Sequence, residues 1–261
     1  MNHLLFWVPS VGLFFLIICA CLITGHFWSR HRNQYVSEAA RSDMRIVETT
    51  IYAIMGLLIA FAFSGANNRL DERRLLIIDE VNSIVATYYT LDVLPPKMQA
   101  EAHQDLKQYV ADRLEWYRVY PDQTAMSQQR QKYQEIQRKL WNMAMLVCNK
   151  PGATQTCAQL PLDISKMITV ENKKTMYKYL HPPVVVYIML LAIVLLGSLL
   201  AGYTVRGTFK ETSVHMLLYA IILSLMIFII LNLEFPRIGS FSSSIFDNFN
   251  TGFVSLQALM K

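Results

Sequence analysis

Charged side chains are scarce in this sequence. They make up 16% of the 261 residues, whereas a soluble domain averages about 25%. Four stretches contain no Asp, Glu, Lys or Arg at all: residues 1–29, 49–68, 181–205 and 212–233. A helix rising about 1.5 Å per residue needs about 20 residues to cross roughly 30 Å of hydrocarbon, and each stretch is long enough. The sequence therefore predicts an integral membrane protein with four transmembrane helices.

Glycine and cysteine are also few. Ten Gly and four Cys exclude collagen-like and disulfide-scaffold proteins, and the 53% hydrophobic content excludes a disordered chain. The sequence has neither a nucleophile elbow nor a phosphate-binding loop. His26 and His31 have no partner carboxylate or thiolate beside them and make a poor metal site. We expect no enzyme, and no catalytic, cofactor or metal site.

The net charge of +5 raises the question of nucleic-acid binding. Residues 69–178 contain 16 Lys or Arg interspersed with 13 Asp or Glu, which is typical of a solvated helical surface. The acidic pairs Asp71-Glu72 and Asp79-Glu80 are interpreted in the same way. We expect no nucleic-acid partner.

The N-terminal apolar stretch has two interpretations. Residues 18–21 loosely resemble a lipoprotein cleavage box, which would fit a signal peptide. Signal peptides begin with basic residues and have a short apolar core. Here no Lys or Arg precedes the apolar run, and the run continues past Cys21. We therefore predict a retained first span over residues 4–24, with Cys19 and Cys21 as packing residues.

The second span, residues 49–68, leads without proline into a long amphipathic helix. Apolar residues recur at helical spacing as far as Pro95, at Ile77, Val81, Ile84, Tyr88 and Leu91. Further helices are predicted over residues 98–120, 125–149 and 162–180, with a loop over 150–157. The third and fourth spans, residues 184–205 and 213–233, form a hairpin.

The predicted fold class is therefore all-α, with four transmembrane helices in two hairpins. The expected domains are a first hairpin (1–68), an extramembrane helical bundle (69–180) and a second hairpin with the C-terminal tail (181–261). Small residues at Gly197, Ser198, Ala201 and Gly202 mark a face where helices approach closely.

The basic residues predict the orientation. The two short connections, residues 25–48 and 206–211, contain six Lys or Arg. Short basic loops remain in the cytoplasm, so the helical bundle and both termini are predicted in the periplasm, with the spans in a bacterial inner membrane. Cys148 and Cys157, separated by eight residues, would close a disulfide worth roughly 2–3 kcal/mol in an oxidising compartment. Two unrelated thiols are the alternative.

Several segments together resemble the bacterial bestrophin-like membrane proteins of unknown function. The match covers roughly residues 50–245 and is carried by residues 56–61, 71–74, 79–84, 160–161, 167–168, 181–183, 199–203 and 232–239. Asn232 and Phe235 depart from that family's usual residues. The resemblance implies distant kinship with bestrophins, which are pentameric anion channels with a large cytosolic helical part. That cytosolic location conflicts with the orientation predicted above.

A pore is expected to be lined by the second span, because this span alone continues into a charged helix. Met55, Ile59 and Phe63, at i, i+4 and i+8, would stack three apolar rings in a homo-oligomer and form a constriction. The same stripe also fits ordinary helix packing or lipid contact. Arg69 and Arg73 are candidates for a basic pore mouth, although interleaved acidic residues leave the selectivity open.

Two functional hypotheses follow. The first is a homo-oligomeric inner-membrane channel for small ions, anions by the resemblance. The second is a non-conducting envelope protein whose helical bundle binds a partner or senses the periplasm. The lipid bilayer is the expected environment in both.

Overall fold

The computed structural model describes residues 2–32, 38–119, 122–149, 155–177, 181–205 and 208–235, together with residues 252, 255, 256 and 258. Within these residues the chain forms seven α-helices, one 3-10 turn and no strand, which confirms the predicted all-α class. The elements are α1 (Asn2–Arg32), α2 (Glu38–Thr90), the 3-10 turn η2 (Leu91–Val93), α3 (Pro96–Arg118), α4 (Gln123–Cys148), α5 (Gln155–Tyr177), α6 (Val184–Thr204) and α7 (Phe209–Glu234).

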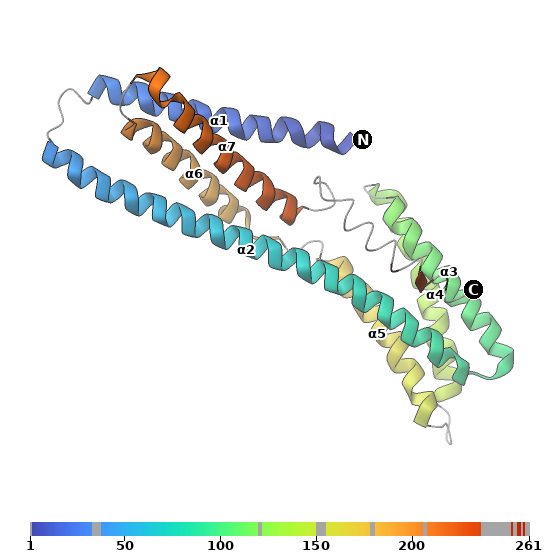
Figure 1. Ribbon diagram of the computed structural model, residues 1–261. Helices are drawn as coiled ribbons and strands as arrows, with labels where there is room; N and C mark the ends of the chain where they lie inside the picture. The colour runs from blue at the N-terminus through green and yellow to red at the C-terminus, as the bar shows by residue number, and fades with distance from the viewer. Residues whose placement is uncertain are drawn as a thin grey trace. The chain divides into compact units, whose positions relative to one another are not determined.

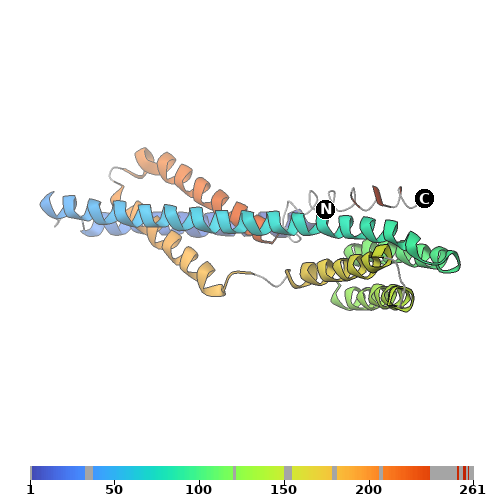
Figure 2. The ribbon, with the colours of Figure 1, turned by 90° about the horizontal axis from the view of Figure 1, so that it is seen from below.

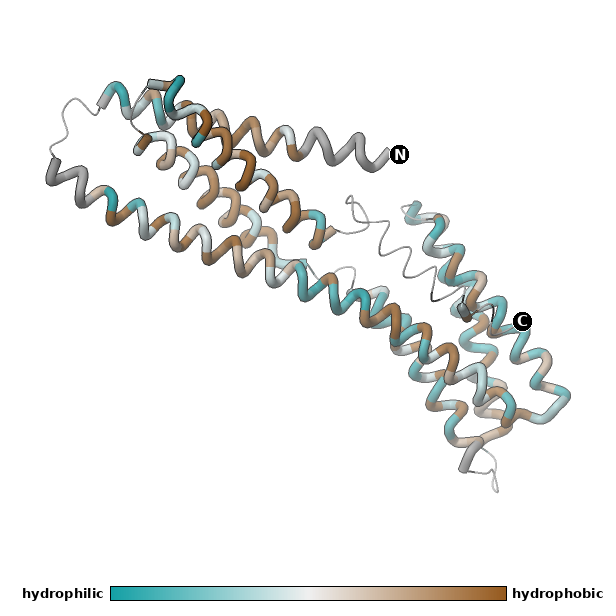
Figure 3. The backbone as a smooth tube through the Cα atoms, viewed as in Figure 1, coloured by the Kyte–Doolittle hydropathy of each residue, from teal (hydrophilic) through white to brown (hydrophobic). Residues whose placement is uncertain are grey.

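Four of the described helices are long and apolar enough to cross a membrane, as predicted. They are α1 over Val11–His31, part of α2 within Met44–Val93, α6, and α7. Figure 3 shows long apolar runs in these helices and a mixed pattern in α3, α4 and α5.

The chain divides into two compact units. We call the first the membrane unit; its described residues are 2–32, 38–71, 181–205 and 208–235. The second, the helical unit, comprises the described residues from Glu72 to Tyr177 and those near the C-terminus. The helix α2 belongs to both units, with the division after Asp71.

Close backbone approach holds the membrane unit together. In Figure 1, α6 and α7 lie beside α1. A Cβ atom placed at Gly202 would overlap the carbonyl oxygen of Leu22, and one placed at Gly25 would overlap that of Leu199. Two of the small residues predicted to form a contact face on the third span therefore do so: Gly202 approaches α1, and Gly197 approaches Met55 of α2.

The helical unit packs α3, α4 and α5 around the later part of α2. Figures 1 and 2 both show α5 running beside this part of α2. The predicted apolar row on α2 is confirmed, because Ile77, Ile84 and Leu91 are buried and Val81 and Tyr88 pack against them. Leu106, Tyr109, Tyr133, Leu140 and Leu160 fill the rest of this core.

Three helices begin four or more residues earlier than predicted. The second starts at Glu38, inside the expected connection. The helix α7 starts at Phe209 because Thr208 and Glu211 form a capping box, in which each side chain accepts a bond from the other residue's backbone N–H. The prediction was also wrong for α5, which starts at Gln155 and contains Pro161. Proline removes one helical hydrogen bond, but burial of Leu160 and Ile164 on either side offsets the loss.

Candidate functional site

One face of α2 is exposed along most of the helix. Its residues alternate in steps of three and four, which is the heptad spacing of helices that supercoil around one another. Twelve of the thirteen are exposed and Val85 is half-buried. We call this set the α2 seam: Val47, Thr50, Ile54, Leu57, Phe61, Ser64, Asn68, Asp71, Leu75, Ile78, Asn82, Val85 and Tyr89.

The seam is uncovered both in the span and beyond it. The apolar window of α2 is 11% buried within the chain, against 22% for α1 and α6 and 33% for α7. Beyond the span, Leu75, Ile78 and Tyr89 remain 59%, 54% and 57% exposed. Within the span such exposure also fits contact with lipid, but beyond it large apolar side chains that recur on one face and stay exposed mark an interaction surface.

The three predicted constriction residues occupy different surroundings. Met55 is 6% exposed and lies in the core of the membrane unit. Its Sδ lies 2.8 Å from the position of a Cβ at Gly197. Ile59 is half-buried against the same core, whereas Phe63 is 41% exposed, on the flank of the seam. Within one chain, therefore, Met55 is covered, Ile59 is partly covered and Phe63 is exposed.

Of the two predicted mouth residues, Arg69 points into the membrane unit. Its Nη2 and Nε lie 2.6 and 2.8 Å from Oε2 of Glu234, at the end of α7. Arg73 is half-buried.

Glu234 is the centre of a three-residue cluster that sequence reasoning missed. Its side chain is 1% exposed, and its Oε1 lies 2.9 Å from Nδ1 of His181. The His181 ring in turn lies 4.8 Å from the Phe235 ring, centroid to centroid. The carboxylate thus joins α2, the segment that leads into α6, and the end of α7.

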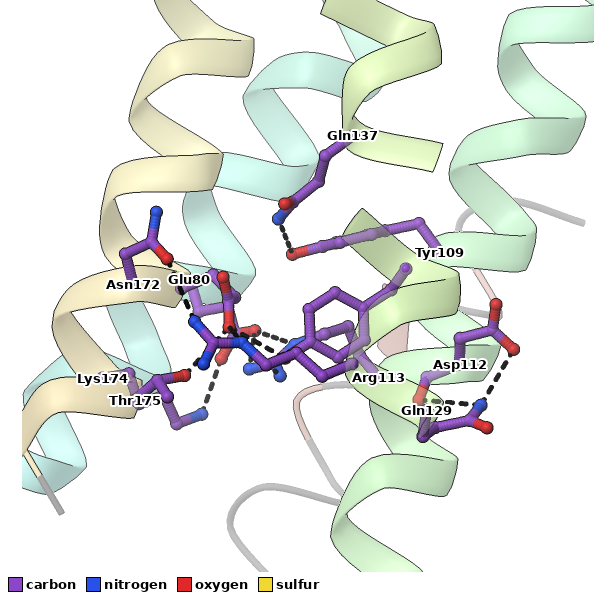
Figure 4. A network of polar contacts seen from close by, with 12 residues as sticks. Glu80, Tyr109, Asp112, Arg113, Gln129, Gln137, Asn172, Lys174 and Thr175 are labelled. Carbon is purple, nitrogen blue, oxygen red and sulfur yellow. Dashed lines mark hydrogen bonds and ion pairs between the residues drawn. The ribbon is translucent and has the colours of Figure 1, made fainter. Parts of the chain in front are cut away.

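A second buried charge cluster holds the helical unit together (Figure 4). Glu80, on α2, and Arg113, on α3, are both fully buried, with Arg113 Nη2 2.5 Å from Glu80 Oε1. Lys174, on the last turn of α5, places its Nζ 2.6 Å from the other carboxylate oxygen of Glu80. The prediction of a solvated Asp79-Glu80 pair was therefore wrong for Glu80, because it lies on the same helix face as Ile77 and Ile84.

The surroundings of Arg113 shift several pKa values. Burial alone would raise the pKa of the Glu80 carboxyl, but Arg113 and Lys174 together hold it below its ordinary value. Burial alone would lower the pKa of Arg113, but Glu80 and nearby tyrosines hold it well above its ordinary value. The guanidinium carbon also lies 4.8 Å from the Tyr133 ring centroid and 5.1 Å from that of Trp116.

Glu171 completes this cluster from α5. Its Oε1 accepts hydrogen bonds from Tyr133 Oη and Thr175 Oγ1, both at 2.9 Å. Nη1 of Arg113 and Nε of Arg130 lie 3.9 and 4.0 Å from the same oxygen. Glu80, Arg113 and Glu171 therefore each face an opposite charge, which is what burial in a low-dielectric interior requires.

Cys148 and Cys157 form a disulfide that joins the end of α4 to the first turn of α5. The Cα atoms are 5.2 Å apart. Cys19 and Cys21 are free and half-buried. In the described part of the chain, no three His, Cys, Asp or Glu residues gather in a way that could hold a metal ion.

Comparison with known proteins identifies the fold. No family model matches the chain, and no curated protein matches it. The structure is similar to the crystal structure of a bacterial bestrophin homolog from Klebsiella pneumoniae that carries a point mutation, with a TM-score of 0.64 and 12% identity. The match covers 95% of this chain and 98% of that chain. The resemblance seen in the sequence is thus confirmed at the level of the fold: this chain has a bestrophin-like fold.

Proposed function

We propose that this protein is a homo-oligomeric membrane channel for small ions. In this proposal the α2 helices of several copies surround a common axis, and their seams line the conduit. The observation that carries the proposal is the heptad spacing of exposed residues along α2. A heptad repeat keeps the same face turned toward partner helices over many turns.

The composition of the seam fits a conduit with a narrow apolar part. Ile54, Leu57 and Phe61 are 47%, 54% and 64% exposed. Rings of such side chains around an axis make a constriction that gates by dewetting. We place the constriction at Leu57 and Phe61, with Phe63 on the flank. The seam then becomes polar at Ser64, Asn68 and Asp71, so ions leaving the constriction would meet hydroxyl, amide and carboxylate groups.

The bestrophin-like fold supports a channel but leaves the sign of the ion open. The resemblance implies anions. However, the charge of Arg69 is paired with Glu234, and the charged residue of the seam is Asp71. The proposal therefore concerns small ions of either sign.

The proposed location is the bacterial inner membrane, with the helical unit on the periplasmic side. The Cys148–Cys157 disulfide supports this orientation, because disulfides persist in oxidising compartments and are rare in the cytosol. The basic residues of the two short connections favour it as well.

Planar bilayer recording of the purified protein tests the proposal. The native protein should carry a current, and Leu57→Ala with Phe61→Ala should increase it because the constriction widens. Leu217→Ala with Ile221→Ala is the matched control, since these side chains are exposed on α7, away from the α2 seam, and their truncation should leave the pore diameter unchanged. Absence of current from all three proteins, across several salts and lipids, would reject the channel.

A non-conducting envelope protein is the second candidate. The observation that favours it is the helical unit itself, which has its own core and a disulfide. In that case the purified protein would be electrically silent and would copurify with a partner bound to the helical unit.

A further inference from the structure

The Glu234 cluster gives α2 a second point of attachment within the membrane unit. Met55 meets α6 at Gly197, where Tyr219 of α7 is also close. Arg69 meets Glu234 fourteen residues later. Fourteen residues at about 100° each fall about 40° short of four full turns, so the two residues lie on the same side of α2, about 21 Å apart along its axis.

Two contacts on one side of a helix fix both its tilt and its rotation. Ala66 and Leu70, on the same side of α2, are buried as well. The α2 seam lies on the side of the helix opposite these residues. The direction in which the seam points therefore depends on the two attachments. The span of α2 has the least burial of the four, so an attachment by charge contributes more to its position than it would in a well-covered helix.

The location of the Glu234 carboxylate is energetically unfavourable by itself, so the contacts that compensate it are important. A carboxylate at the C-terminal end of a helix faces the negative end of the helix dipole. Here the carboxylate is also almost completely buried, and it depends on Arg69 at one oxygen and on His181 at the other. Loss of the direct contact with the Arg69 guanidinium would weaken the compensation of this buried charge, which is destabilising.

We propose that Glu234 is the positioning residue of α2: it sets the rotation of the helix and therefore the direction in which the α2 seam points. Arg69 transmits this constraint to α2, and His181 holds the other carboxylate oxygen in place. This inference rests on the proposed function for its consequence, because a misdirected seam would no longer line a conduit.

The test measures the rotation of α2 within one chain. Met55→Cys and Gly197→Cys are introduced together in a protein with Cys19→Ser and Cys21→Ser, and the two thiols are joined by a short bifunctional thiol reagent. Glu234→Gln should reduce this intramolecular cross-linking several-fold. The charge exchange Arg69→Glu with Glu234→Arg should restore it, because the opposite charges face each other again. Glu72→Gln, an exposed residue of α2 outside the seam, is the matched control and should have no effect.

Two results would overturn the proposal. One is unchanged cross-linking in Glu234→Gln; the other is a loss that the charge exchange fails to restore, which would indicate general misfolding. A separate measurement, cross-linking between copies through Leu57→Cys, reports on the conduit. If the protein with native Glu234 shows the intramolecular cross-link but no Leu57→Cys cross-link between copies, the channel proposal fails and the positioning role of Glu234 stands.

Discussion

Glu80 and Arg113 face each other inside the helical unit, both fully buried, with Arg113 Nη2 2.5 Å from Glu80 Oε1. One residue comes from the helix that continues into the membrane and the other from the extramembrane bundle. This pair ties the later part of α2 to α3 within the helical unit, and its removal has measurable consequences.

Glu80→Gln should destabilise the helical unit by about 3–5 kcal/mol, because it removes the closest negative charge from the buried Arg113, whose other acidic neighbour, Glu171, is 3.9 Å away. Chemical unfolding of the full-length protein in mild detergent, followed by hydrogen exchange in α3 and α4, measures the loss. Lys139→Met is the control, since Lys139 pairs with Glu101 and Asp105 on the surface and such pairs are worth about 0–1 kcal/mol. Equal effects of the two substitutions would contradict the assignment.

The same carboxylate predicts acid sensitivity. The folded-state pKa of Glu80 is below the ordinary value of 4.5, so its contribution to stability is present above that value and is lost as the pH falls through the folded-state pKa. The free energy of unfolding of the helical unit should therefore decrease on acidification below about pH 4.5. In Glu80→Gln the decrease should be shallower. Parallel pH profiles for the two proteins would show that other groups control the acid response.

Cys148→Ser should lower the stability of the helical unit by about 2–3 kcal/mol, the value expected for a ring of this size. Thiol titration of the freshly isolated, denatured protein should detect two free thiols, from Cys19 and Cys21, and four after reduction. Four thiols without reductant would mean that the disulfide does not form in the cell, and would remove support for the periplasmic orientation.

Gly202→Ala should weaken the contact of α1 with α6 by about 1–3 kcal/mol, the usual cost of overpacking, because its Cβ would overlap the backbone of Leu22. Size-exclusion chromatography in detergent after heating reports the change as loss of the folded peak. Gly12→Ala offers a matched control, since no atom lies within 4 Å of its added Cβ. Similar heat resistance of the two variants would argue that this approach is not tight.

Long apolar runs without charge made the four membrane helices predictable, because crossing hydrocarbon imposes a length and a composition. The row from Ile77 to Leu91 was predictable for the same kind of reason, since a helix buries residues at its own period. The starts of the helices were harder to predict. No local sequence pattern marks Glu38 as a helix start, and α5 continues through Pro161 because the neighbours of this proline are buried.

The charge clusters were harder to predict. Glu80 follows Ile77 by three residues and precedes Ile84 by four, so helical spacing indicated its burial, although its partners on α3 and α5 are distant in sequence. Glu234 and Arg69 are 165 residues apart, and no local pattern links them. The α2 seam was not predicted from the sequence. Its heptad spacing could be recognised only after the structure showed which face of α2 is buried.

The central claim is that the seams of several α2 helices surround one axis. A structure of the assembled protein in lipid nanodiscs tests it most directly, through the distance of each α2 side chain from the symmetry axis. We expect the seam residues to lie nearest the axis, with the narrowest point at Leu57 and Phe61. A monomer, or an assembly in which these two side chains face lipid, would contradict the account.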